Sequence, residues 1–137
     1  MKSNQAIAHQ KQDKRLMVAD RKSKRREEIL RTCRFRDDKE KKDIARFLAE
    51  HNFLVPLVLE ALANLRQTFG EGAVPVLSLV IDPEDEDFEE LFISIITDKP
   101  TDEALDLLDQ FDEEWFVDVL PETKNRLNVT IETKYAI

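Results

Sequence analysis

Carboxylate side chains are the residues of this chain whose spacing comes nearest to a chemical site. The densest run is DPEDEDFEE, residues 82–90, in which Asp82, Glu84 and Glu86 alternate. A calcium-binding loop needs such alternation, but it also needs a glycine at its sixth position, where this chain carries Asp87. We therefore predict a solvated acidic hairpin here rather than a cation site.

A metal-dependent phosphoryl-transfer site is the second chemistry that carboxylates could supply. Asp82 and Asp98 each follow an apolar β run, and Glu132 lies in a third run. If the first two runs pair antiparallel, Asp82 and Asp98 fall at opposite ends of the sheet, so they cannot hold ions about 4 Å apart. A glycine-rich phosphate loop is also missing, because the two glycines are Gly70 and Gly72.

Nucleophilic catalysis would need Ser, His and Asp, or Cys and His, to meet in one place. The chain has two histidines far apart in sequence and one cysteine, Cys33, in its basic N-terminal part. We therefore predict a protein that is not an enzyme, with no catalytic residues, no cofactor and no bound metal.

The segment FDEEWF, residues 111–116, could act as an acidic and aromatic recognition motif. Phe111 and Trp115 are four residues apart, however, and they continue an apolar stripe at helical spacing. Burial in the core is therefore the better interpretation, and Trp115→Ala is expected to unfold the domain.

Charge divides the chain into two parts. The formal net charge of the 137 residues is −8. Residues 1–43 hold 15 Lys and Arg against 8 Asp and Glu, a net of +7, whereas residues 44–137 hold 6 against 21, a net of −15. This asymmetry predicts a basic N-terminal arm, residues 1–38, and a single acidic domain, residues 39–137.

The basic arm carries a cluster of cations that could bind phosphate. Its members are Arg21, Lys22, Lys24, Arg25 and Arg26. Such a cluster is typical of nucleic-acid binding, but Glu27 and Glu28 follow it directly and no aromatic residue separates the cations for base stacking. Coulomb attraction also favours docking of the arm on the acidic domain. Its scattered apolar residues predict a mobile tail or a frayed helix.

Export and membrane insertion have no support in the sequence. The longest apolar runs fall far short of the roughly 18 residues that span a bilayer. The polar N-terminus lacks the apolar core of a signal peptide. We expect a cytoplasmic protein with no membrane partner.

The first half of the domain is predicted to be helical. DIARFLAE, residues 43–50, repeats apolar side chains at i, i+3 and i+4, which is typical of an amphipathic helix. The pattern breaks at His51 and Asn52, and a longer apolar helix follows. Gly70 stands where the C-terminal cap of that helix belongs.

Three β runs and one further helix make up the second half. VPVLSLVI, residues 74–81, and LFISIIT, residues 91–97, are apolar on both faces, whereas NVTIETKY, residues 128–135, alternates like a half-exposed edge strand. Between the last two runs, residues 101–120 place an apolar stripe opposite a row of carboxylates, as a helix on a core would. The acidic run at residues 82–90 is expected to be a long hairpin loop.

This order of elements, α-(α)-β-β-α-β, predicts an α+β fold with a three-stranded mixed sheet. We expect the first strand in the middle, because it is apolar on both faces, which gives the order 2-1-3 with the helices on one face. The uncovered face would carry the residues expected to bind a partner: Val76, Ser78, Val80, Phe92, Ser94 and Ile96, beside Thr130 and Glu132. A face this apolar is most simply covered by a second copy in a homodimer.

The runs HNFLVPLVLEAL, IDPEDEDFEELFISIIT and FDEEWF, with the alternating strand after them, resemble a family of small uncharacterised bacterial proteins common in cyanobacteria. The resemblance covers about residues 44–135 and excludes the basic arm. It implies no activity and no site residues, because that family has no established function.

Two functions fit these observations. The first is a non-catalytic protein–protein interaction module, such as an antitoxin-like or regulatory small subunit, that acts as a homodimer and engages a basic protein partner. The alternative is a nucleic-acid-associated regulator that binds phosphate through the basic arm.

Overall fold

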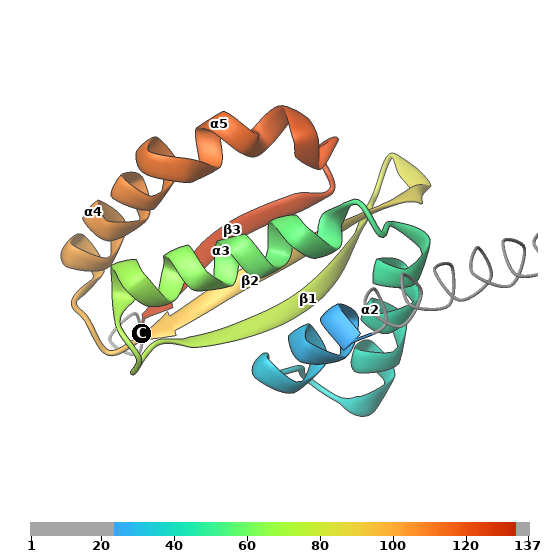
Figure 1. Cartoon of the computed structure of the whole chain (residues 1–137), viewed down its shortest axis with the longest axis horizontal. Helices are drawn as coiled ribbons and strands as arrows, with labels where there is room; N and C mark the ends of the chain where they lie inside the picture. The colour runs from blue at the N-terminus through green and yellow to red at the C-terminus, as the bar shows by residue number, and fades with distance from the viewer. Residues whose placement is uncertain (1–23, 134–137) are drawn as a thin grey trace, which may run out of the picture.

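The structure of this chain is a computed structural model that describes residues 24–133, in which helices cover one face of a three-stranded sheet (Figure 1). The described end of helix α1 spans residues 24–32. The other elements are α2 (Asp38–Glu50), α3 (Leu54–Phe69), β1 (Val74–Asp82), β2 (Asp85–Thr97), α4 (Thr101–Phe111), the π-helical turn η1 (Asp112–Phe116), α5 (Val117–Val119), the 3₁₀ turn η2 (Leu120–Thr123) and β3 (Leu127–Thr133).

The sheet has β2 in its middle. This strand pairs antiparallel with β1 and parallel with β3, so the strand order is β1-β2-β3. The α+β class and the mixed three-stranded sheet are therefore confirmed, whereas the predicted order 2-1-3 is wrong.

The free edge of β1 explains this error. The Arg34 N–H donates to the Pro75 carbonyl at 2.9 Å, and the Leu77 N–H donates to the Arg34 carbonyl at 2.9 Å. Two residues further along, the Leu79 N–H donates to the Glu40 carboxylate at 3.2 Å. Because these groups satisfy the edge of β1, the strand can be apolar on both faces without lying in the middle.

The hairpin between β1 and β2 is tighter than the acidic sequence suggested. β1 ends at Asp82 and β2 begins at Asp85, so only Pro83 and Glu84 connect the strands, after a shift in register beyond Ile81. The Asp82 carboxylate accepts a hydrogen bond of 2.8 Å from the Glu84 N–H and closes the turn. The predicted long loop is therefore wrong, and most of its carboxylates lie on β2.

Helices α2 and α3 form as the apolar spacing predicts. The apolar residues of α2 at that spacing, Ile44, Phe47 and Leu48, are all fully buried. α3 ends at Gly70, whose φ of 87° is a conformation that glycine adopts with little strain.

The described residues of the basic arm pack against the domain. Ile29 is fully buried and Cys33 is 7% exposed, and both belong to the same core as the sheet. Burial raises the pKa of the Cys33 thiol to about 12, so the group stays neutral. The core therefore continues across residue 38, where we expected the domain to begin, while residues 1–23 lie outside the described part of the chain.

The helix that follows Pro100 changes its register at its aromatic segment. The Val117 N–H donates to the Asp112 carbonyl five residues earlier, which is the hydrogen bond of a π-helical turn. After this turn both following rings lie near Phe111, with ring centroids 5.5 Å away for Trp115 and 5.9 Å away for Phe116. Both phenylalanines are buried, at 1% and 7% exposure, whereas Trp115 is only partly buried.

The difference in burial between these aromatic side chains predicts how much each one contributes to the free energy of unfolding. We predict that Phe111→Ala lowers the free energy of unfolding by about 3–5 kcal/mol, because it empties a closed site in the core. Trp115→Ala is expected to cost clearly less, because part of that ring is already in water. Urea unfolding followed by far-ultraviolet circular dichroism would measure both, and equal losses would contradict the π-helical register.

Candidate interaction face

The face of the sheet turned away from α3 and α4 brings the predicted partner-binding residues together. We call it the open face. Its rows across the strands are Val74–Ile96–Glu132, Val76–Ser94–Thr130, Ser78–Phe92–Asn128 and Val80–Glu90. All of the residues that the sequence assigned to this face therefore share it, even though the strand order was predicted wrongly. Ser78, however, is only 8% exposed and is already covered within the chain.

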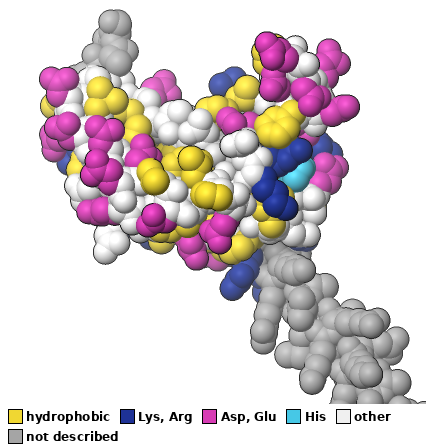
Figure 2. Space-filling view, turned by 90° about the horizontal axis from the view of Figure 1, so that it is seen from above, with side chains coloured by type: hydrophobic (Ala, Val, Ile, Leu, Met, Phe, Trp, Pro, Cys, Tyr) yellow, Lys and Arg dark blue, Asp and Glu magenta, His cyan; other side chains and the backbone are white. Residues whose placement is uncertain are grey.

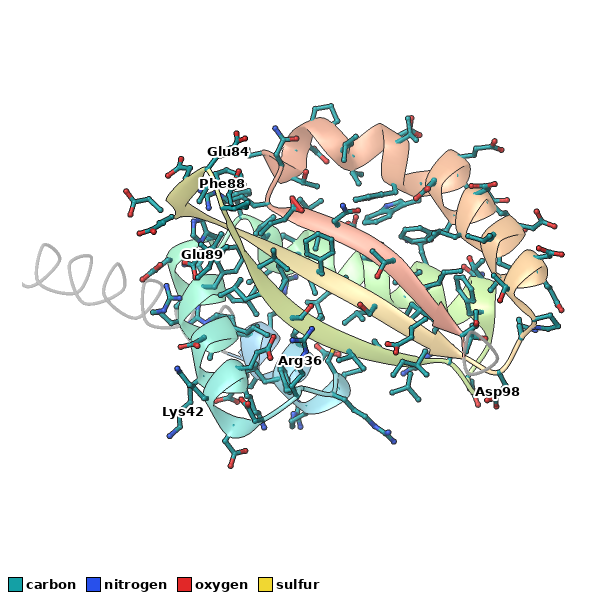
Figure 3. The ribbon with its side chains drawn as sticks, turned by 180° about the vertical axis from the view of Figure 1, so that it is seen from behind. Arg36, Lys42, Glu84, Phe88, Glu89 and Asp98 are labelled. Atoms are coloured by element: carbon teal, nitrogen blue, oxygen red, sulfur yellow. The ribbon has the colours of Figure 1, made fainter. Side chains whose placement is uncertain are left out.

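No described helix covers the open face. Figure 3 looks onto it, with the three strands in front and α3 behind them. On the covered face, Leu77, Leu91 and Ile93 are fully buried. On the open face, Phe92 and Ile96 are only half-buried, although they alternate with those core residues along the same strand.

Polar contacts on the open face are short and local. The Ser94 and Thr130 hydroxyls lie 3.1 Å apart in a hydrogen bond between β2 and β3. Partial burial raises the pKa of the Glu90 carboxyl, with nearby Asp82 adding to the rise and a hydrogen bond from Asn128 opposing it. The face thus has apolar side chains around a small polar centre.

Charges of opposite sign lie at the two edges of the open face. At the β1 edge, Arg34 bridges to Val76, and bridged residues point to the same side of a sheet. Arg36 follows beside β1 (Figure 3), with its side chain 75% exposed and 3.9 Å from the Glu40 carboxylate. At the opposite edge, Glu132 on β3 is exposed. The β1 edge therefore carries two arginines and the Glu40 carboxylate, whereas the β3 edge carries the exposed Glu132.

The carboxylates considered for metal chemistry do not come together. Asp82 lies at the hairpin end of the sheet, and Asp98 follows the opposite end of β2, as Figure 3 shows through the labels of Glu84 and Asp98. Within residues 24–133, no group of three or more His, Cys, Asp or Glu side chains is placed to hold a metal ion.

The predicted phosphate-binding cluster is only partly described. Lys24 and Arg25 are exposed on α1, and Arg26 donates a hydrogen bond of 2.7 Å to the Asn52 side chain. Arg21 and Lys22 lie outside the described residues. One member of the cluster thus ties α1 to the turn before α3, which leaves the two exposed neighbours for other contacts.

A second set of cations, which the sequence did not reveal, surrounds the hairpin end of the sheet. Lys124 lies over the Phe53 ring, 4.5 Å from its centroid, and Arg126 lies 4.4 Å from the centroid of Phe88. Figure 2 shows Lys and Arg side chains gathered beside the one described histidine. These contacts join three separate segments, and each one stabilises the fold by about 0.5–1 kcal/mol. No spacing within one segment could have predicted them.

Arg46 adds an ion pair to this end of the molecule. Its guanidinium lies 2.9 Å from the Glu89 carboxylate on β2 and 3.0 Å from Glu50. The base of the hairpin is thereby tied to α2.

Comparison with protein families, with curated proteins and with solved structures found no match for the chain. The resemblance to small cyanobacterial-type proteins therefore stays a prediction. None of the helices within residues 24–133 is long and apolar enough to cross a membrane.

The partly buried Glu90 carboxyl predicts a pH dependence of stability. Because burial raises its pKa above the ordinary value of 4.5, the folded state favours the protonated form. Its stabilising contribution is then complete below about pH 4.5 and is lost as the pH rises through the raised pKa. We predict that Glu90→Gln is more stable than the wild type at pH 7 and that this advantage shrinks towards pH 4.5.

Urea titrations of both proteins across this pH range would test the prediction. Glu86→Gln is the matched control, because Glu86 is an exposed carboxylate on the same strand. A difference between wild type and Glu90→Gln that does not change with pH would contradict the role of burial.

Proposed function

We propose that this chain is a non-catalytic protein-interaction module, of the kind of a regulatory or antitoxin-like small subunit, which docks on another protein through its open face. The observation that supports the proposal is a half-apolar sheet face opposite one whose centre, at Leu77, Leu91 and Ile93, is fully buried. Phe92 and Ile96 keep part of their apolar surface in water, and Val80 is 45% exposed. A partner that covers these side chains would gain about 25 cal/mol for each Å² of apolar surface removed from water.

The acidic surface of α4 and the turns that follow it would attract a basic partner at a second contact. Residues 101–123 contain nine Asp and Glu and no Lys or Arg. Figure 2 shows carboxylates gathered over the α4 side of the molecule. In the same segment, Leu105 is 46% exposed. Such charge mainly speeds the encounter with a partner of opposite sign and rejects partners of like sign.

Placing a positive charge on the open face tests this function. Phe92→Lys places a cation in the middle of the face, and Val117→Lys makes the equivalent change on the helical side. A tagged full-length chain is expressed in its native host together with an untagged copy. The wild type is expected to retain a set of proteins that includes the untagged copy. We predict that Phe92→Lys no longer retains these proteins, whereas Val117→Lys still does.

Circular dichroism melting curves of the purified variants would establish that both fold. Retention of every partner by a folded Phe92→Lys variant would show that the open face is not the binding surface. Loss of the partners from Val117→Lys alone would move the site to the helical layer.

Binding of nucleic acid through the arm is the second candidate. One observation favours it: Lys24 and Arg25 are exposed on a helix that Ile29 and Arg26 fix to the domain. Phosphate contacts release counterions, so affinity for single-stranded DNA or RNA should fall steeply with salt. Replacing Lys24 and Arg25 with Gln should weaken binding and reduce the salt slope by roughly one to two units. Binding that is absent, or that does not depend on salt, would contradict this candidate.

A further inference from the structure

We propose that the partner of the open face is a second copy of this chain, and that the two copies are related by a two-fold axis parallel to β2. This inference rests on the proposed function, since it names the occupant of the same face. It adds a specific orientation, which follows from the arrangement of charge at the two edges.

The strand order limits the ways in which two open faces can stack. In a two-fold dimer packed face to face, the axis lies between the sheets and parallel to them, and its two limiting directions run along the strands and across them. An axis along the strands places β2 over β2 and puts β1 of one copy over β3 of its partner. An axis across the strands places β1 over β1 and β3 over β3.

The edge charges choose between these two axes. Along β1 lie Arg34 and Arg36, and Glu132 lies on β3. With the axis along the strands, the basic edge of each copy faces the acidic edge of the other. With the axis across the strands, the arginines of the two copies would face each other, and like charges opposite one another disfavour binding.

The register shows that these charges can reach one another. Arg34 is level with Val76 and Thr130, and Glu132 is two residues further along β3. Stacked sheets lie about 10 Å apart, Arg34 lies about 5 Å outside β1, and two residues of strand span roughly 7 Å, so the two Cα atoms would be about 13 Å apart. Extended arginine and glutamate side chains can together bridge this distance. The dimer would therefore contain two equivalent ion pairs, one at each edge.

The central strand supplies the apolar part of this interface. An axis along β2 brings the row Phe92, Ser94 and Ile96 against the same row of the partner. Because this axis keeps each residue at its own level along the strand, Phe92 and Ile96 each face their own copy in the partner, and the small Ser94 faces the partner's Ser94. The open face measures roughly 14 by 23 Å from strand spacing and length, which is small for a stable dimer. We therefore expect dissociation in the micromolar range.

Charge exchange tests the orientation directly. Arg34→Glu and Glu132→Lys are made singly in the full chain, and sedimentation velocity is recorded across the micromolar range. Each single variant creates two like-charge pairs, so its dimer dissociation constant should rise about tenfold. In an equal mixture of the two variants, both edge pairs have opposite charges, so the heterodimer should bind as tightly as the wild type. The double variant Arg34→Glu/Glu132→Lys should also recover the dimer.

Arg66→Glu is the matched control, because it changes the net charge equally on α3, on the other side of the sheet. It should leave the dissociation constant unchanged. Failure of the mixture to dimerise more tightly than either variant alone would overturn the proposed orientation. A wild type that stays monomeric throughout the range would overturn the dimer itself. The proposed function would still stand in that case if Phe92→Lys failed to retain the other proteins that the wild type retains.

Discussion

Coverage of the free edge of β1 is the constraint on which the rest of the structure depends. The Arg34 backbone bonds to Pro75 and Leu77, and the Glu40 carboxylate bonds to the Leu79 N–H. These contacts join the basic segment to the sheet and draw Ile29 and Cys33 into the core. They also close one edge of the sheet to any further strand. A partner must then approach from the open face or from the β3 side.

The open face could be predicted from the sequence, whereas the strand order could not. Alternation with a period of two assigns Phe92 and Ile93 to opposite faces whatever strand lies beside them. Strand order depends instead on which edges stay unpaired. A strand whose edge is covered by a single bridged residue and a carboxylate has the same apolar pattern as a central strand. The hydrogen bond between Glu40 and Leu79 joins positions 39 residues apart, and no local pattern contains it.

The aromatic segment that begins at the end of α4, residues 111–116, is a second place where helical spacing alone does not predict the packing. Spacing by four residues assigned Trp115 to the core beside Phe111. Trp115 does lie beside Phe111, with ring centroids 5.5 Å apart, but after the π-helical turn Phe116 is the more deeply buried of the two neighbours, at 7% exposure. Spacing alone did not show that the second ring would also enter the core. The acidic character of the helix was evident from the sequence, because its carboxylates remain on the outer side in either register.

The division of charge along the chain takes on a different meaning once the fold is known. The sequence alone predicts an acidic domain that engages a partner and a basic arm that either docks on this domain or binds phosphate. In the structure, the Arg26 guanidinium holds the turn before α3, so one cation of the arm has a structural task, whereas Arg34 closes the sheet edge through its backbone. Because Arg34 comes from the basic segment and Glu132 from the acidic domain, folding turns a division along the chain into a division across one face. Such a face is complementary to itself only when it is rotated about an axis along its central strand. The charge asymmetry and the uncovered sheet, which looked like separate features of the sequence, therefore support the same mode of association.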